Sequence, residues 1–167
     1  MRISAHGLAV DLPTGWEGRI RRQPLPVEAG CADTPKFRSH AMLHAADFPL
    51  PDERGDFGSG AVETMRSHHA FIALVEYGSG SAGTALFASG GMPRELRTDE
   101  FSGRQLQRTL RGQGGVQRFF VEEGRAFCLY VVLGSMADRG RVVPRVNAVL
   151  SAISISAALP PEWLEAM

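Results

Sequence analysis

Three arginines with helical spacing form the most distinctive polar pattern in this chain of 167 residues. Arg104, Arg108 and Arg111 are four and then three positions apart, which places them on one face of a helix predicted over residues 102–111. Arg118 follows in the next apolar segment. Such guanidinium groups can bind a carboxylate, a phosphate or an acidic protein surface through paired hydrogen bonds. The alternative is a solvated helix face that nearby carboxylates partly neutralise, namely Asp99 and Glu100.

Cys128 raises the question of nucleophilic chemistry, because it lies in the apolar run of residues 126–133. A reactive thiol needs a lowered pKa, which a nearby cation or a helix N-terminus provides. Burial among apolar neighbours raises the pKa instead, so we interpret Cys128 as an inert core residue. Cys31 lies in a segment rich in proline and glycine, and we expect it to react first with a thiol reagent.

The histidines and the short motifs do not indicate a metal or a cofactor. His40 and His44 are four positions apart on a predicted strand, a separation of roughly 13 Å. That is too far for one zinc ion, whose bonds to nitrogen are about 2 Å long. The Arg-Gly-Asp tripeptide at residues 54–56 is expected often by chance. We therefore predict no metal site and no cofactor.

The overall charge is balanced, with 18 basic and 18 acidic residues. A neutral chain lacks the field that attracts nucleic acid or an anionic membrane, so neither is an expected partner. The N-terminus does not resemble a secretory signal, and no apolar stretch is long enough for a membrane span. Lys36 is the only lysine, a composition typical of GC-rich bacteria. We predict a cytoplasmic bacterial protein with one domain, residues 1–158, and a C-terminal tail, residues 159–167.

The element pattern predicts an α+β fold, with helices packed on a twisted antiparallel β-sheet. Apolar residues alternate with polar ones in several segments joined by short turns, and strands joined in this way are antiparallel. The predicted strands cover residues 8–12, 16–20, 38–50, 71–77, 84–89, 116–121 and 127–133. Short helices are predicted at residues 59–67, capped by Ser59, and at residues 102–111.

A longer helix is predicted over residues 142–153, beginning near Val142 or Val143 because Pro144 suits only a first turn. We expect the long apolar hairpin of residues 116–133 to be central in the sheet. The N-terminal strand and residues 84–89 are the expected edges.

Both ends of the chain resemble the PsbP-like superfamily. LAVDLPTGWEG, residues 8–18, is similar to the superfamily's opening strand, LP-x-GW-type turn and return strand. GRAFCLYVVLGS and RVNAVLSAISI, residues 124–135 and 145–155, are similar to its closing strand and C-terminal helix. The resemblance implies an α/β/α sandwich around an antiparallel sheet, and a role as a binding or accessory protein. It covers about a third of the chain and implies no site residues.

Two functions remain open from the sequence. The first is a non-enzymatic binding or adaptor domain that acts through a protein interface, in a homodimer or a larger bacterial assembly. It rests on the lack of a catalytic motif, the balanced charge and the family resemblance. The apolar tail with Trp163 either docks on its own domain, where it can cover a sheet edge, or crosses to a partner. The second is a binder of small anionic ligands, or an unrecognised enzyme, that uses the face formed by Arg104, Arg108 and Arg111.

Overall fold

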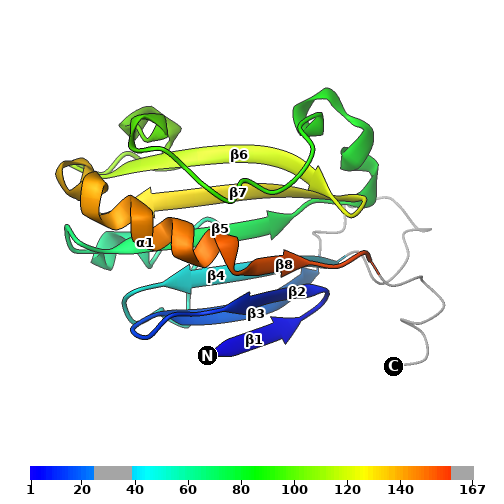
Figure 1. Ribbon diagram of the computed structural model, residues 1–167, viewed down its shortest axis with the longest axis horizontal. Helices are drawn as coiled ribbons and strands as arrows, with labels where there is room; N and C mark the ends of the chain where they lie inside the picture. Colours follow the sequence, from blue (N-terminus) through cyan, green and yellow to red (C-terminus); the bar gives the residue numbers. More distant parts are fainter. Residues whose placement is uncertain (25–38, 159–167) are drawn as a thin grey trace.

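The computed structural model describes residues 1–24 and 39–158. Its main sheet has five antiparallel strands in the order β3-β4-β5-β7-β6 (Figure 1). In chain order these are β3 (Glu17–Pro24), β4 (Ser39–Ala46), β5 (Ala70–Glu76), β6 (Gly114–Glu122) and β7 (Arg125–Leu133). Trp163 and the predicted tail lie outside the described residues, as does Cys31.

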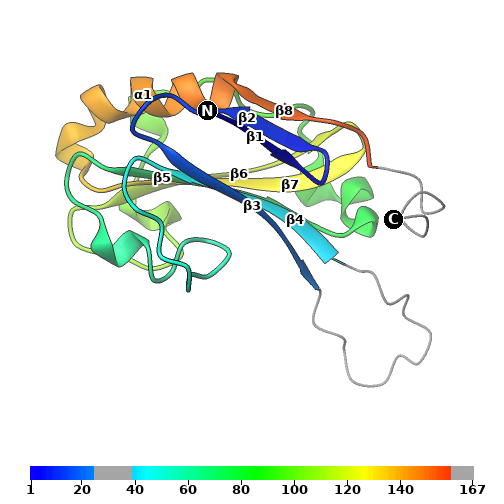
Figure 2. The same cartoon turned by 90° about the horizontal axis from the view of Figure 1, so that it is seen from below.

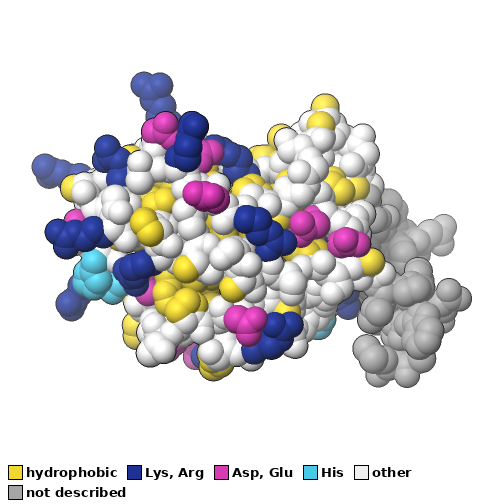
Figure 3. Space-filling view, in the orientation of Figure 1, with side chains coloured by type: hydrophobic (Ala, Val, Ile, Leu, Met, Phe, Trp, Pro, Cys, Tyr) yellow, Lys and Arg dark blue, Asp and Glu magenta, His cyan; other side chains and the backbone are white. Residues whose placement is uncertain are grey.

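A smaller antiparallel sheet and the α-helix cover one face of the main sheet (Figure 2). The small sheet has the order β1-β2-β8, formed by β1 (Arg2–Ala5), β2 (Leu8–Asp11) and β8 (Ile153–Ile155). The helix α1 (Arg139–Ser151) runs directly into β8. The predicted α+β class with antiparallel sheets is therefore confirmed. On this side of the molecule, arginines and carboxylates are both scattered between small apolar patches (Figure 3).

The main core lies between the five-stranded sheet and this covering layer. Leu43, Ile72 and Leu129 point to the same face from neighbouring strands and are fully buried. They pack against Val146 of α1 and Val10 of β2, which are also fully buried. Burial of such an aliphatic side chain contributes about 1.5–3 kcal/mol. Every second residue of a strand, and residues three or four apart in a helix, lie on the same face, so the apolar residues at these spacings form this core.

The opposite face of the main sheet carries loops and short 3-10 helices in the described residues (Figure 2). Met42, Phe71 and Val132 are buried beneath them in a second apolar cluster. The resemblance implies helices on both faces, whereas α1 is the one α-helix in the described part of the chain. The described residues form six 3-10 helices, of which η4 and η6 contact α1: η1 (Val62–Thr64), η2 (Ser79–Gly83), η3 (Ala85–Phe87), η4 (Thr98–Glu100), η5 (Gly103–Gln105) and η6 (Met136–Asp138).

Arg125 of β7 connects the two sheets from a buried position, with 5% of its side chain exposed. Its guanidinium pairs with both carboxylate oxygens of Glu76 on β5. It also donates to the backbone oxygen of Ser156, which follows β8, at 2.9 Å, and to that of His6 at 3.1 Å. Its charge is neutralised and it satisfies backbone groups of the small sheet, so its removal would leave the Glu76 carboxylate and both carbonyls without their partner.

The predicted strands at residues 8–12, 71–77, 116–121 and 127–133 are confirmed within one or two residues. The strand predicted at residues 84–89 is wrong, because this stretch forms η3 and buries Phe87 alone among its apolar residues. The long hairpin is not central, since β6 is an edge strand. Its edge is covered by backbone hydrogen bonds to Ser89, Gly91 and Ser102.

The helix α1 begins three residues earlier than predicted, at Arg139. Pro144 therefore lies in its interior and offers no N–H to the carbonyl of Gly140. The Ser59 cap is wrong as well: η1 has Ala61 at its N-cap, and the Gly60 N–H is bound by the carboxylate of Glu63 at 2.7 Å. None of the helices described in residues 1–24 and 39–158 has the length and hydropathy that a bilayer span requires.

Candidate functional site

The helix predicted over residues 102–111 is wrong, and the shared arginine face is not formed. This segment contains only the single turn η5, and Leu106 is already extended. Its backbone is bonded to the main sheet instead. Ser102 and Gly115 exchange hydrogen bonds of 3.0 and 2.9 Å, and the Gln107 N–H donates to the hydroxyl of Tyr130 at 2.8 Å. Glycine at position 103, inside the predicted helix, further weakens the helical alternative.

The four predicted arginines therefore have different surroundings. Arg104 and Arg111 are exposed. Arg118 pairs with Glu100 at 2.9 Å. It is the register partner of Leu129, which belongs to the core on the α1 side of the sheet, so Arg118 points to that side as well. The pocket described next lies on the other side. The hydrogen bond from the Arg97 N–H, followed by the Arg118 pair, lowers the pKa of Glu100. Arg108 alone among the four lines the pocket.

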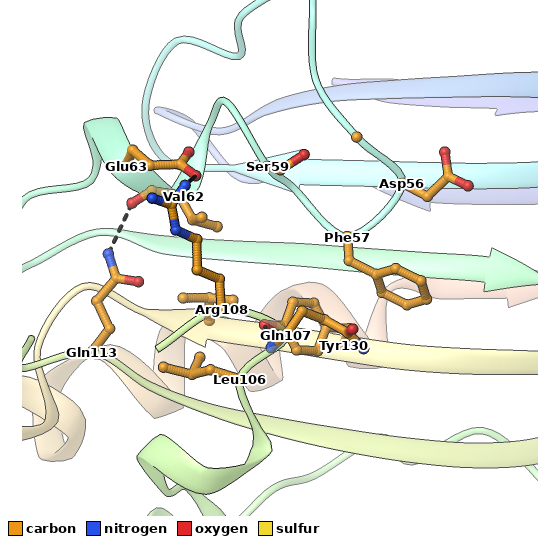
Figure 4. A pocket seen from close by; sticks show the side chains of 12 residues that line it. Asp56, Phe57, Ser59, Val62, Glu63, Leu106, Gln107, Arg108, Gln113 and Tyr130 are labelled. Atoms are coloured by element: carbon orange, nitrogen blue, oxygen red, sulfur yellow. Dashed lines mark hydrogen bonds and ion pairs between the residues drawn. The ribbon is translucent and has the colours of Figure 1, made fainter. Parts of the chain in front are cut away.

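The pocket has a volume of about 500 Å³ and lies on the sheet face opposite α1 (Figure 4). One wall is the loop of residues 55–63, which contributes Gly55, Asp56, Phe57, Ser59, Val62 and Glu63. The facing wall is the segment before β6, which contributes Leu106, Gln107, Arg108 and Gln113. The floor is formed by Tyr130 and Val132 of β7. This volume lies within the range of small-molecule sites.

Glycines fold the loop of residues 55–63 closely onto the sheet. Gly58 has a φ of +87°, and a Cβ atom there would lie 2.5 Å from the ring of Phe71. Gly60 has a φ of +92°. Because side chains strongly disfavour this backbone region, these two glycines fix the path of the wall. The carbonyl of Gly58 then accepts hydrogen bonds from the N–H groups of Ala61 and Val62, both at 2.9 Å.

His44 and Arg54 anchor the start of this loop. Arg54 Nε–H donates to Nδ1 of His44 at 2.7 Å, so the ring proton is on Nε2, which donates to the backbone oxygen of Asp56 at 2.7 Å. Burial lowers the pKa of His44 to about 4, which keeps it neutral in this role. Burial, with repulsion from Arg21, lowers the pKa of Arg54 to about 10. Arg21 and Arg54 also hold buried N–H groups without a partner among the described residues, but neither lines the pocket.

Gln113 supplies the best-defined polar group of the pocket. Its Nε2 donates to the backbone oxygen of Val62 at 2.8 Å, which links the two walls (Figure 4). Since a carbonyl only accepts, this bond determines which end of the amide is nitrogen. The other end, Oε1, is buried and has no hydrogen-bond partner in the described part of the chain. A buried acceptor left in this state costs about 1–3 kcal/mol.

Tyr130 and Arg108 complete the polar lining. The Tyr130 oxygen accepts from the Gln107 N–H, so its own proton is available for a second bond, and burial raises its pKa. The Arg108 guanidinium is 3.4 Å from the carboxylate of Glu63, across the opening between the walls (Figure 4). The Arg108 side chain is 70% exposed, so this ion pair is weak and can open readily.

The remaining chemistry predicted from the sequence does not converge on this pocket. Cys128 is fully buried, which confirms its expected place in the core, and burial raises its pKa to about 11. Among the described residues, no serine, threonine or cysteine side chain bonds a histidine, and no cluster of three metal-binding side chains occurs. A second hollow of about 450 Å³ lies beside His68 and His69, but it contains no unpartnered buried group.

Arg108 was the one pocket residue identified from the sequence. Gln113 and Tyr130 were missed because neither belongs to a sequence motif. Only the folded chain brings the two side chains to the same cavity. The glycines of the segment GDFGSG, residues 55–60, were the available signal for a closely folded loop.

A scan against protein-family models found no match, and searches of the curated proteins and of the solved structures found no significant similarity.

Proposed function

We propose that this protein is a small-molecule-binding domain whose ligand occupies the pocket between residues 55–63 and 106–113. The observation that carries the proposal is a cavity of about 500 Å³ with apolar side chains on its walls and floor, in which the Tyr130 hydroxyl proton is available for a further hydrogen bond. A ligand that fills the cavity can accept this proton.

The apolar lining supports the same role. Val62, Leu106 and Val132 offer aliphatic contact, and Phe57 and Tyr130 meet edge to face with their ring centres 5.5 Å apart. A cavity with apolar walls and a few oriented polar groups is the usual form of a ligand site. The resemblance of the chain ends to the PsbP-like superfamily, whose members are mostly binding or accessory proteins, favours binding without catalysis.

The protein-interface hypothesis remains a prediction. It rests on the lack of a catalytic motif, the balanced charge and the resemblance to the PsbP-like superfamily. Trp163 and the tail, which were expected to contribute to an interface, lie outside the described residues. The homodimer, the larger bacterial assembly and the cytoplasmic location also remain predictions. The anionic-ligand alternative loses the shared helix face on which Arg104, Arg108 and Arg111 were expected to meet.

A variant that fills the pocket tests the proposal. Leu106→Trp places a large ring in the cavity, and Leu86→Trp, at a side chain that is 59% exposed, is the matched control. A library of small organic fragments is screened by thermal shift, and hits are measured by calorimetry. We expect hits that bind the wild type and Leu86→Trp and lose at least tenfold in affinity for Leu106→Trp. Equal binding to all three proteins would contradict the proposed site.

A further inference from the structure

The hydroxyl of Tyr130 specifies which kind of hydrogen-bonding group a ligand must present. Its oxygen accepts the Gln107 N–H at 2.8 Å, which holds the hydroxyl in place at the floor of the cavity. The O–H itself donates to no acceptor among the described residues, so its proton is available to a ligand. The complementary ligand group is therefore an acceptor, such as a carbonyl or ether oxygen.

The charged groups at the opening of the cavity form a matched pair. The Arg108 guanidinium and the Glu63 carboxylate meet there at 3.4 Å, and the Gly60 N–H holds the second oxygen of Glu63 in place. The carboxylate of Asp56 points away from the cavity (Figure 4). A ligand anion that took Arg108 would leave Glu63 beside it as an unpaired like charge, and a ligand cation that took Glu63 would leave Arg108 in the same way. The opening therefore favours an ionised ligand of neither sign.

The interior of the cavity disfavours an ionised group as well. Val62, Leu106 and Val132 line it with aliphatic carbon, and the ring of Phe57 meets that of Tyr130 edge to face. Burial raises the pKa of Tyr130, because the negative phenolate is poorly solvated at this floor. A ligand carboxylate or ammonium group at the same place would also lose its water, whereas a neutral carbonyl loses less.

Taking the available proton, the paired charges and the apolar walls together, we propose that the pocket binds an uncharged, largely apolar organic compound that carries a hydrogen-bond acceptor, such as a ketone, an ester or an ether. The acceptor oxygen takes the Tyr130 O–H, and the apolar body packs against Leu106 and Val132. This inference rests on the proposed function and specifies the ligand class of the same site.

Four probes of nearly the same shape test it: acetophenone, α-methylstyrene, benzoate and benzamidine. α-Methylstyrene has a CH₂ group in place of the ketone oxygen, whereas at neutral pH benzoate is an anion and benzamidine a cation. Affinities are measured by nuclear magnetic resonance titration of the isotope-labelled full chain. We expect acetophenone to bind about threefold or more tightly than α-methylstyrene, and about tenfold or more tightly than either ionised probe.

Tyr130→Phe removes the hydroxyl and keeps the ring. It should weaken acetophenone about threefold or more and leave α-methylstyrene unchanged, because the ketone alone uses the proton. α-Methylstyrene thereby reports any general change in the pocket, including one caused by the loss of the bond from the Gln107 N–H. Tyr77→Phe, at the second of the two tyrosines and outside the pocket lining, is the matched control and should alter the affinity of neither probe.

The outcomes separate the ligand class from the site. Tightest binding by benzoate or benzamidine, equal affinities for acetophenone and α-methylstyrene, or no binding of acetophenone would overturn the assignment. Equal responses of these two neutral probes to Tyr130→Phe would overturn it too. The proposed function is judged by the fragment screen with Leu106→Trp, which makes no assumption about charge or acceptor, so it can stand when the assignment fails.

Discussion

Replacing His44 with glutamine should change how the stability of the protein depends on pH. His44 is 1% exposed and lies beneath the start of the pocket wall, bonded to Arg54 and to the backbone of Asp56. Burial is the largest cause that lowers its pKa from 6.5 to about 4, and the positive charges of Arg54 and Arg21 add to it. Glutamine does not titrate and retains an N–H that can reach the same carbonyl.

The expected magnitude follows from the two pKa values. The folded pKa is lower than that of the unfolded chain, so between these values the unfolded chain binds the proton and the folded protein does not. The contribution is therefore complete above about pH 6.5 and is lost as the pH falls toward 4. At 1.36 kcal/mol for each pKa unit, the loss is about 2 kcal/mol by pH 5 and about 3 kcal/mol by pH 4.

Urea unfolding of the wild type and His44→Gln between about pH 8 and pH 5 measures this loss. Groups that titrate in both proteins cancel in the difference between them. We expect the stability advantage of the wild type to shrink by about 2 kcal/mol over this range. If His44→Gln remained parallel to the wild type over this range, His44 would not be a neutral buried anchor.

Three further changes test the core and the pocket wall. Arg125→Met should lower the free energy of unfolding, measured in urea, by about 3–5 kcal/mol, because it leaves the buried Glu76 carboxylate unpaired. Arg2→Met, which breaks an exposed ion pair, should lower it by about 1 kcal/mol or less. Equal effects would contradict the role of Arg125 between the sheets. A thiol reagent should leave Cys128 unlabelled in the native protein near pH 8, because burial raises its pKa to about 11, and rapid labelling would show an accessible thiol. Gly58→Ala should destabilise the protein by about 1–3 kcal/mol in thermal unfolding, because Gly58 has a positive φ and an added Cβ would meet the ring of Phe71. Gly80→Ala, where an added Cβ meets no atom, should be nearly neutral. Similar melting temperatures for the two variants would refute this account of the loop.

The sheet could be predicted because its strands are long apolar segments bounded by turn residues. Ile72 and Leu74 face one core and Phe71 and Val75 the other, so β5 is buried on both sides and has few alternatives. The helix α1 was equally clear from its valines. Residues 102–111 were assigned wrongly because they contain few apolar residues, and in such a segment local propensity is overridden by hydrogen bonds to the sheet edge. Residues 84–89 are mostly apolar, but the fold buries Phe87 alone among them, so their apolar pattern did not correspond to a strand.

The pocket could not be predicted for a related reason. Gln113 and Tyr130 are 17 positions apart, and Glu63 is another 50 residues before Gln113, so no local pattern connects them. Only the pairing of β6 with β7 and the path set by Gly58 bring them together. The arginine spacing was a real pattern, but it implied a helix that the sheet edge prevents, and it yielded Arg108 alone.

The most direct test of the central claim is a nuclear magnetic resonance titration of the isotope-labelled full chain with a fragment that passes the screen. A ligand in the pocket should shift the side-chain amide signals of Gln113, together with backbone signals of residues 55–63 and 106–113, and leave β1 and α1 unchanged. Shifts confined to another surface, with the Gln113 amide unaffected at saturation, would contradict the claim that this pocket is the binding site.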